Sequence, residues 1–102
     1  MASVSTLLSL LDYQTESVVS RVLLKNKGGN VTLFAFDRNE GLSEHTAPFD
    51  ALVIVLDGEA EVTISGTSHT LRAGETITMP AGEPHSLKAL TAFKMLLVMV
   101  RE

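Results

Sequence analysis

The chain has 102 residues, a formal net charge of −4 and no cysteine, and hydrophobic residues make up 45% of it. This length fits one domain with one core. The acidic balance excludes the basic surface that a nucleic acid backbone requires, and the lack of cysteine excludes disulfides and thiol chemistry. No apolar run reaches the roughly 18 residues of a membrane span. We therefore expect a cytoplasmic protein without a nucleic acid or membrane partner.

The N-terminal residues, about 1–16, predict a short helical or extended arm in front of a barrel over residues 17–102, with 1–102 forming a single domain. Within the arm, VSTLLSLL over residues 4–11 favours a short helix, because a serine or threonine can cap it and four leucines can share one face. After this arm β-branched residues dominate, and the two glycines of NKGGN indicate a turn. The next segment, VTLFAFD over residues 31–37, is apolar on both faces, which is typical of a strand covered on two sides.

The rest of the chain consists of short apolar segments separated by turns. After an expected loop over residues 38–50 come ALVIVLDG, EAEVTISG, TSHTLRAG and ETITMPAG, each ending in glycine, and the last segment is AFKMLLVMVRE. About eight short strands at regular spacing, with no long helix, are typical of a β-sandwich or a small barrel. We therefore predict an all-β fold whose strands project side chains into a shared interior.

The chain has only three histidines, which are the main candidates for chemistry: His45, His69 and His85. His85 ends the turn PAGEPH, in which two prolines fix the backbone and Gly82 permits conformations that other residues resist. Such a rigid turn can aim His85 into the barrel, although the same turn can also serve only to join two strands. His69 lies in a hairpin strand, where we expect it to face solvent.

Two residue spacings in the second half of the chain resemble the motifs of the cupin family. The second motif, Gly-x5-Pro-x-Gly-x2-His, is matched by Gly74, Pro80, Gly82 and His85. Residues 41–58, GLSEHTAPFDALVIVLDG, resemble the first motif, and the resemblance as a whole extends from about Val31 to Val100. It implies a small single-domain cupin of the germin-like or RmlC-like type, which is a double-stranded β-helix, or jelly-roll, barrel.

The resemblance also implies where a metal would lie. Metal-binding cupins hold a divalent transition metal (Zn, Ni, Fe, Mn or Cu) with four residues, whose positions here are His45, Ala47, Ala51 and His85. Alanine cannot coordinate, and two imidazoles are fewer ligands than zinc or non-haem iron normally takes. Asp50 stays open as a third ligand, since strand alternation turns it away unless Pro48 distorts the strand. The asparagine that often ends the second motif falls on Ala89.

We predict that His45 and His85 meet inside the barrel, in a ligand-binding pocket that other side chains complete: Ala47, Phe49, Ala51 and Met79. The first hypothesis is a module that binds a small organic molecule without a metal, in an apolar pocket with a few polar groups. The alternative is an enzyme of oxygenase or isomerase type, metal-dependent or metal-free, in which His45 or His85 is the catalytic acid or base. A regulatory subunit is a third hypothesis and requires a separate partner chain.

Two doubly apolar strands, VTLFAF and LVIVL, also predict a homodimer, since packing or exchange of strands between two copies would bury their second faces.

Overall fold

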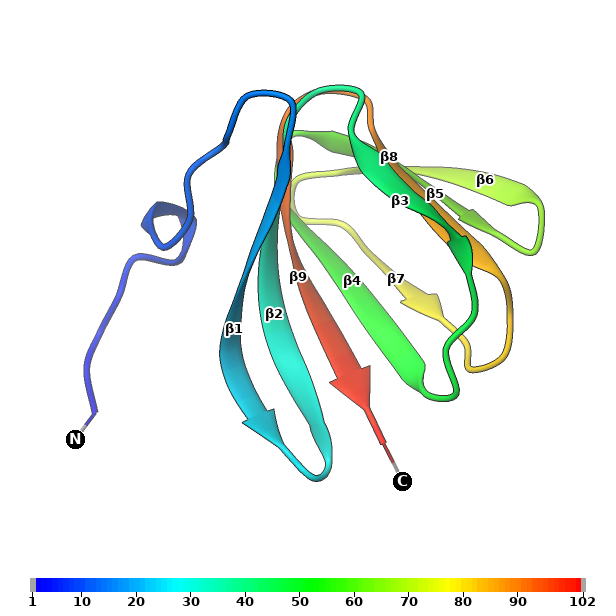
Figure 1. The fold of residues 1–102 in the computed structure, drawn as a ribbon, viewed down its shortest axis with the longest axis horizontal. Helices are drawn as coiled ribbons and strands as arrows, with labels where there is room; N and C mark the ends of the chain where they lie inside the picture. Colours follow the sequence, from blue (N-terminus) through cyan, green and yellow to red (C-terminus); the bar gives the residue numbers. More distant parts are fainter. Residues whose placement is uncertain (1, 102) are drawn as a thin grey trace.

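Nine strands form two antiparallel sheets that face each other in the computed structural model, which describes residues 2–101 (Figure 1). The five-stranded sheet has the order β1 (Val18–Asn26), β2 (Gly29–Phe36), β9 (Phe93–Val100), β4 (Asp50–Asp57), β7 (Thr76–Met79). The four-stranded sheet has the order β3 (Gly41–His45), β8 (His85–Ala89), β5 (Glu59–Ile64), β6 (Thr67–Arg72). The all-β jelly-roll predicted from the sequence is confirmed.

Strand β3 lies within the segment 38–50 that the sequence pattern predicts to be a loop. Its residues, GLSEH, do not alternate between apolar and polar, so a search for period two misses it. The pairing of β3 with β8 shifts register between Leu42 and His45, because an irregularity interrupts the ladder there. This irregularity brings Leu42 and His45, three residues apart, into contact with the same interior space.

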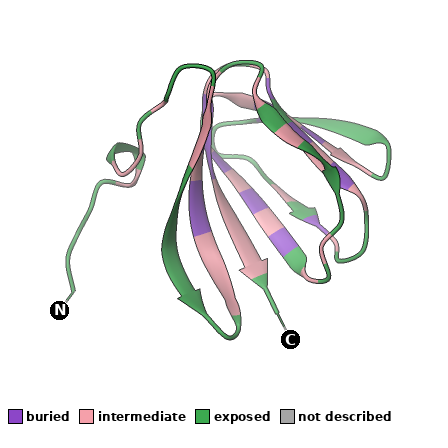
Figure 2. Ribbon diagram, viewed as in Figure 1, coloured by how far each residue is buried: buried purple, intermediate pink, exposed green. Residues whose placement is uncertain are grey.

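The hydrophobic core lies between the two sheets and follows from strand alternation. Along β4 the buried residues Ala51, Val53 and Val55 alternate with more exposed ones (Figure 2). Phe36 and Phe93, which oppose each other across β2 and β9, are fully buried, and their rings stack with centroids 4.4 Å apart. Stacked aromatic pairs contribute more than their buried area alone, so this pair anchors the centre of the core.

The N-terminal arm is extended and contains one turn of 3₁₀ helix, Leu7–Ser9, in place of the helix predicted over residues 4–11. The side chain of the N-cap residue, Thr6, makes no capping hydrogen bond to this turn. Two carbonyls of the arm instead accept hydrogen bonds from the sheet, Leu8 from the Lys94 ammonium at 2.7 Å and Leu10 from the Arg21 guanidinium at 3.1 Å. Between residues 2 and 101 there is no helix with the length and hydropathy needed to span a membrane.

The arm explains why β2 is buried on both faces. Lys94 and Arg21, which hold the arm, oppose Ala35 and Leu33 in the strand pairing and therefore share their outer face of the sheet. Leu33 and Ala35 are fully buried. The prediction that residues 31–37 are covered on two sides is confirmed at Leu33 and Ala35, where the chain's own N-terminal segment is bonded on the second side, whereas Val31 is only half-buried.

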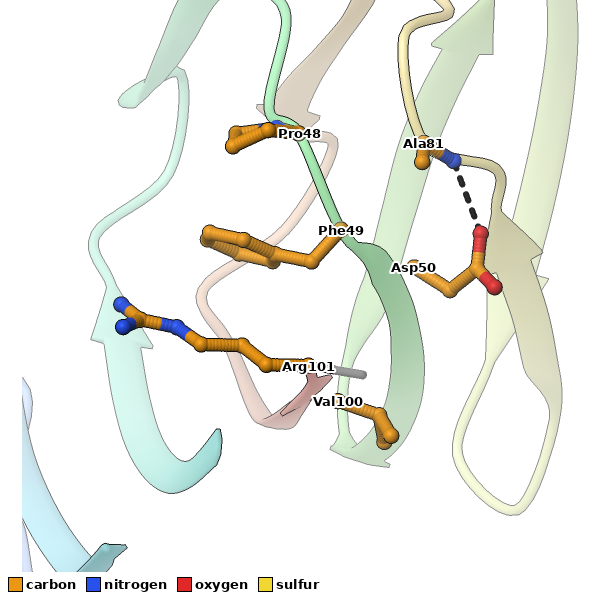
Figure 3. A pocket seen from close by; sticks show the side chains of 6 residues that line it. All are labelled: Pro48, Phe49, Asp50, Ala81, Val100 and Arg101. Atoms are coloured by element: carbon orange, nitrogen blue, oxygen red, sulfur yellow. Dashed lines mark hydrogen bonds between the residues drawn. The ribbon is translucent and has the colours of Figure 1, made fainter. Parts of the chain in front are cut away.

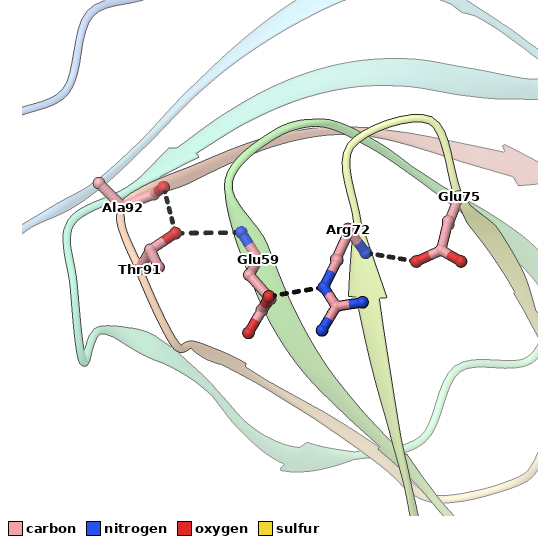
Figure 4. A network of polar contacts seen from close by, with 5 residues as sticks. All are labelled: Glu59, Arg72, Glu75, Thr91 and Ala92. Carbon is pink, nitrogen blue, oxygen red and sulfur yellow. Dashed lines mark hydrogen bonds and ion pairs between the residues drawn. The ribbon is translucent and has the colours of Figure 1, made fainter.

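Polar contacts fasten one end of the barrel, where β4 turns into β5 and β6 into β7 (Figure 4). The Arg72 guanidinium donates to the Glu59 carboxylate at 2.9 Å, and the Arg72 backbone N–H donates to Glu75 at 2.7 Å. The Thr91 hydroxyl accepts from the Glu59 backbone N–H at 3.0 Å. Arg72 is largely exposed, so its ion pair adds little stability, and the network acts mainly to hold the turns together.

Candidate functional site

The turn PAGEPH, residues 80–85, joins β7 to β8 at the opposite end of the barrel from this network. Gly82 has φ +79°, a left-handed conformation that glycine adopts without the steric cost of a Cβ atom. Its backbone N–H donates to the Ala47 carbonyl at 2.9 Å, while the Ala81 N–H donates to an Asp50 carboxylate oxygen at 2.8 Å. Both bonds tie the turn to the segment that leads from β3 into β4.

The other side of the turn is tied to the hairpin between β5 and β6. The Ser65 backbone N–H donates to the Pro84 carbonyl at 2.8 Å, and the Ser65 hydroxyl donates to the Glu83 carboxylate at 3.0 Å. The turn is therefore held on two sides before the chain enters β8, so the backbone at His85 has a fixed position. This geometry supports the interpretation of the turn as a device for presenting His85.

His85 and His45 lie directly opposite each other across β8 and β3. Their Nε2 atoms are 3.1 Å apart, and the rings meet edge to face with centroids 4.4 Å apart. His85 is buried and His45 is exposed, so the pair spans from the barrel interior to solvent. Each Nδ1 faces a backbone carbonyl, that of Ser43 at 2.8 Å from His45 and that of Glu83 at 3.1 Å from His85.

The hydrogen-bond partners of His45 and His85 determine which ring nitrogens carry protons. A carbonyl oxygen can only accept, so each Nδ1 that bonds to one carries a proton and leaves its Nε2 without one. Two neutral rings then turn two acceptors toward each other. If both Nδ1–carbonyl bonds and a bond between the two Nε2 atoms form together, each bond needs its own proton. The pair then carries three protons and a positive charge. Otherwise a donor or a cation from outside must satisfy both Nε2 atoms.

Behind the two imidazoles lies a small cavity of about 50 Å³. It is lined by Leu42, His45, Ala47, Ala51, Met79, His85, Leu87, Met95, Leu97 and Met99. Ordinary ligand pockets measure roughly 300–1,000 Å³, so only a very small group fits without rearrangement. Three of the chain's four methionines are among these residues. Because methionine is unbranched and flexible, the lining can adapt to a larger occupant.

The predicted site residues divide between this cavity and the outside of the barrel. Ala47, Ala51 and Met79 line the cavity beside the histidines. Phe49 and Asp50 do not line it; they line a groove on the outer side, where Asp50 opposes Val100. The exposed position predicted for His69 is confirmed.

Sequence reasoning missed three leucines, Leu42, Leu87 and Leu97, as lining residues. Leu87 is detectable in principle, because it lies two residues after His85 and therefore on the same face of β8. Leu42 is not detectable from alternation, because the register shift in β3 separates it from His45 by three residues.

The donor set does not fit a resident transition metal. The two imidazoles converge, but the remaining positions given by the family resemblance are alanines. Within residues 2–101 no group of three or more histidine, aspartate, glutamate or cysteine side chains is placed to hold an ion. Asp50 bonds to Ala81, and the Glu83 carboxylate bonds to Ser65. The part of the chain that the structure describes thus offers two ligands where zinc or non-haem iron takes at least three.

Comparison with known proteins gives consistent results. Residues 32–101 match the cupin domain family. A conserved protein of unknown function from Streptococcus pyogenes is similar at 37% identity with a TM-score of 0.94, and the match covers 100% of this chain and 90% of that one. A cupin superfamily protein from Desulfitobacterium hafniense is similar at 28% identity with a TM-score of 0.88, covering 92% and 86% of the two chains.

A cupin 2 conserved barrel domain protein from Leptotrichia buccalis is similar at 36% identity with a TM-score of 0.89, covering 92% of this chain and 46% of that one. No protein of curated function matches the sequence. The family match spans most of the chain and agrees with the two sheets and with both motifs. The chain therefore belongs to the cupin domain family.

Proposed function

We propose that this chain is a cytoplasmic binding protein that holds a small organic molecule at the mouth of the barrel, between His45 and His85. The observation that carries the proposal is the convergence of two Nε2 atoms, 3.1 Å apart, on an otherwise apolar cavity. Apolar walls with a few converging polar atoms are the usual composition of a ligand site.

The proton count defines the ligand's chemistry. With both Nδ1 atoms bonded to carbonyls, the Nε2 atoms of the neutral pair are acceptors, so the ligand must supply a hydroxyl or amine donor. The apolar part of the ligand would enter the space beside Ala47 and Ala51. The alanine side chains leave room there that a glutamate or histidine at the same positions would fill. A ligand larger than the cavity would displace the methionine side chains, which have several low-energy conformations.

A thermal-shift and NMR screen of sugars, organic acids and aromatic alcohols against the full chain tests this proposal. We expect a hit to raise the melting temperature and to shift the ring signals of His45 and His85. His85→Ala should abolish both effects, and His69→Ala is the matched control because that imidazole is exposed on β6. A hit that survives both His45→Ala and His85→Ala, or no hit at all, would overturn the proposal.

A second candidate is a metal-free enzyme of isomerase type that uses the same histidines. The observation that favours it is the carbonyl behind each imidazole, which orients the ring as the carboxylate of many catalytic histidines does. Proton transfer between the paired Nε2 atoms would then let one ring accept a proton while the other donates one. Exchange of ligand C–H protons with D₂O, lost in either alanine variant, would distinguish this activity from binding alone.

A divalent transition metal (Zn, Ni, Fe, Mn or Cu) would need further ligands from the bound molecule or from water. We expect the pair alone to bind added Ni²⁺ or Cu²⁺ weakly and reversibly, since imidazole suits both ions. Elemental analysis of tag-free protein, purified without chelator, should therefore find much less than one ion per chain. A stoichiometric ion that is lost in both His45→Ala and His85→Ala would contradict this expectation.

We also propose a homodimer that packs through the uncovered part of the five-stranded sheet. An apolar row crosses four neighbouring strands on the outer face: Leu24, Val31, Val98 and Leu52. A twofold axis would place this row against its own copy, so that apolar side chains meet apolar side chains. Light scattering should give twice the 11.0 kDa chain mass, and Val98→Glu should give a monomer. A monomeric wild-type protein would overturn this part of the proposal.

A further inference from the structure

A second hollow, distinct from the cavity behind the histidines, lies on the outer side of the five-stranded sheet (Figure 3). It is an open groove of about 500 Å³, within the usual size range of ligand pockets. It is lined by Pro48, Phe49, Asp50, Ala81, Val100 and Arg101. None of these residues lines the inner cavity, because alternation along β4 turns Asp50 outward and Ala51 inward.

The first charged wall of the groove is Arg101. Its backbone N–H donates to the Gly28 carbonyl at 2.7 Å, which fixes the residue to the hairpin between β1 and β2. Its guanidinium carbon lies 5.2 Å from the centroid of the Phe49 ring, a cation–π distance. Within residues 2–101 this guanidinium forms no hydrogen bond or ion pair. Stacking on the ring leaves the N–H donors at its edge available for a carboxylate.

The second charged wall is Asp50, whose carboxylate is directed toward Ala81 and away from the Phe49 ring (Figure 3). One carboxylate oxygen accepts the Ala81 N–H at 2.8 Å, and the second oxygen has no partner among residues 2–101. A simple anion at Arg101 would gain from the guanidinium and lose from this carboxylate. A molecule with a carboxylate at one end and an ammonium at the other would gain from both.

We propose that this groove binds a small amino-carboxylate, with its carboxylate on Arg101, its ammonium on Asp50 and its apolar body against Phe49, Pro48 and Val100. The site is independent of the proposed function at the histidines. The apolar floor explains why a carbon chain between the two charges is favoured, since Val100 is 58% exposed and gains cover from it. The opposite charges of the walls give the bound molecule one direction in the groove.

Three probes of equal chain length test the proposal by NMR titration of the full chain: 6-aminohexanoate, hexanoate and hexylamine. We expect 6-aminohexanoate to bind more tightly than either of the others, by about two- to fivefold for each charge, as exposed ion pairs contribute. The shifted backbone signals should belong to residues 48–50, 81 and 100–101. Equal binding of all three probes, no binding, or shifts confined to the inner cavity would overturn the proposal.

Two variants separate the walls. Arg101→Gln should reduce the affinity for 6-aminohexanoate to that for hexylamine, and Asp50→Asn should reduce it to that for hexanoate. Asparagine keeps an oxygen that can accept the Ala81 N–H, so Asp50→Asn removes the charge without freeing the turn. His69→Ala is the control and should leave 6-aminohexanoate binding unchanged, because this imidazole is exposed on β6 and lines neither hollow. The backbone signals that shift tell whether a probe binds in the groove or at the histidines, so failure of one proposal is distinguishable from failure of the other.

Discussion

The two faces of the five-stranded sheet have similar apolar composition but are covered in different ways. The inner face packs on the four-stranded sheet, so Val53, Val55 and Met95, on strands β4 and β9, are fully buried. The outer face is covered at one end, where the arm is bonded to Arg21 beside the fully buried Leu33. At the other end Leu24 is 63% exposed, and the groove opens beside β9.

This difference shows that an apolar pattern in a strand predicts that a face is buried but does not identify the element that buries it. The same alternation in β2 places Phe34 and Phe36 against the opposite sheet and Leu33 and Ala35 under the arm. The opposite sheet and the arm do not cover the rest of the outer face, which a second copy of the chain or a ligand would cover. Variants that disturb one of these covers at a time can therefore separate their contributions to the stability of the fold.

The largest effect is expected at the centre of the inner face. Met95→Ala should lower the free energy of unfolding by about 2–5 kcal/mol, because it removes a fully buried side chain and enlarges the cavity that this side chain lines. Met99→Ala, on the same face but half-buried near the mouth, should cost clearly less. Urea denaturation of both variants measures the difference. Equal costs would show that the difference in burial between the two methionines does not set their contribution to stability.

The cover provided by the arm is tested by two leucines that oppose each other across β2 and β9. Leu33 is fully buried and Leu96 is half-buried on the same outer face. Leu33→Ala should cost about 2–3 kcal/mol, at the low end for a leucine because the arm can collapse into the space. Leu96→Ala should cost less, as denaturation can show. A larger cost for Leu96 would mean that another element covers this face.

A smaller effect is expected where the two faces are linked. Asp50 lies on the outer face, yet its carboxylate holds the Ala81 N–H of the turn that presents His85 on the inner side. Asp50→Ala should cost about 0.5–1.5 kcal/mol, the net value of one hydrogen bond, and should shift the ring signals of His85 in NMR spectra. Asp50→Asn retains an acceptor and should preserve those signals. Equal shifts in both variants would assign the effect to charge rather than to the bond.

Much of the fold follows from the sequence because it depends on local periodicity. Alternation and glycine turns predict most strands, and the motif around His85 identifies the end of the barrel where the histidines meet. Strand β3 escapes prediction because a register shift breaks its period, and the same shift hides Leu42. The position of Phe49 depends on its contact with Arg101, about fifty residues away, which no local pattern contains.

The smallest effect on stability at neutral pH, about 0.5 kcal/mol or less, is expected from the bond that ties the end of the arm to the sheet. The Tyr13 hydroxyl donates to the Asp57 carboxylate, and the Lys94 ammonium lies 4.9 Å from the Tyr13 ring centroid. Burial, then the hydrogen bond to Asp57 and the negative charge of that carboxylate, raise the pKa of Tyr13 well above its ordinary value. The neutral phenol is thus favoured in the folded state.

The sign of the pH dependence follows from this direction. Stabilisation by Tyr13 is complete below the unfolded pKa of about 10 and is lost as the pH rises toward the higher folded pKa, because the unfolded chain releases its proton first. Tyr13 is the only tyrosine and the chain has no tryptophan, so phenolate absorbance reports this group alone. Asp57→Asn should move the titration back toward pH 10. If wild-type Tyr13 itself titrates near pH 10, the arm does not hold the phenol against Asp57, and the bonds of Leu8 and Leu10 to Lys94 and Arg21 are left to tie the arm to the sheet.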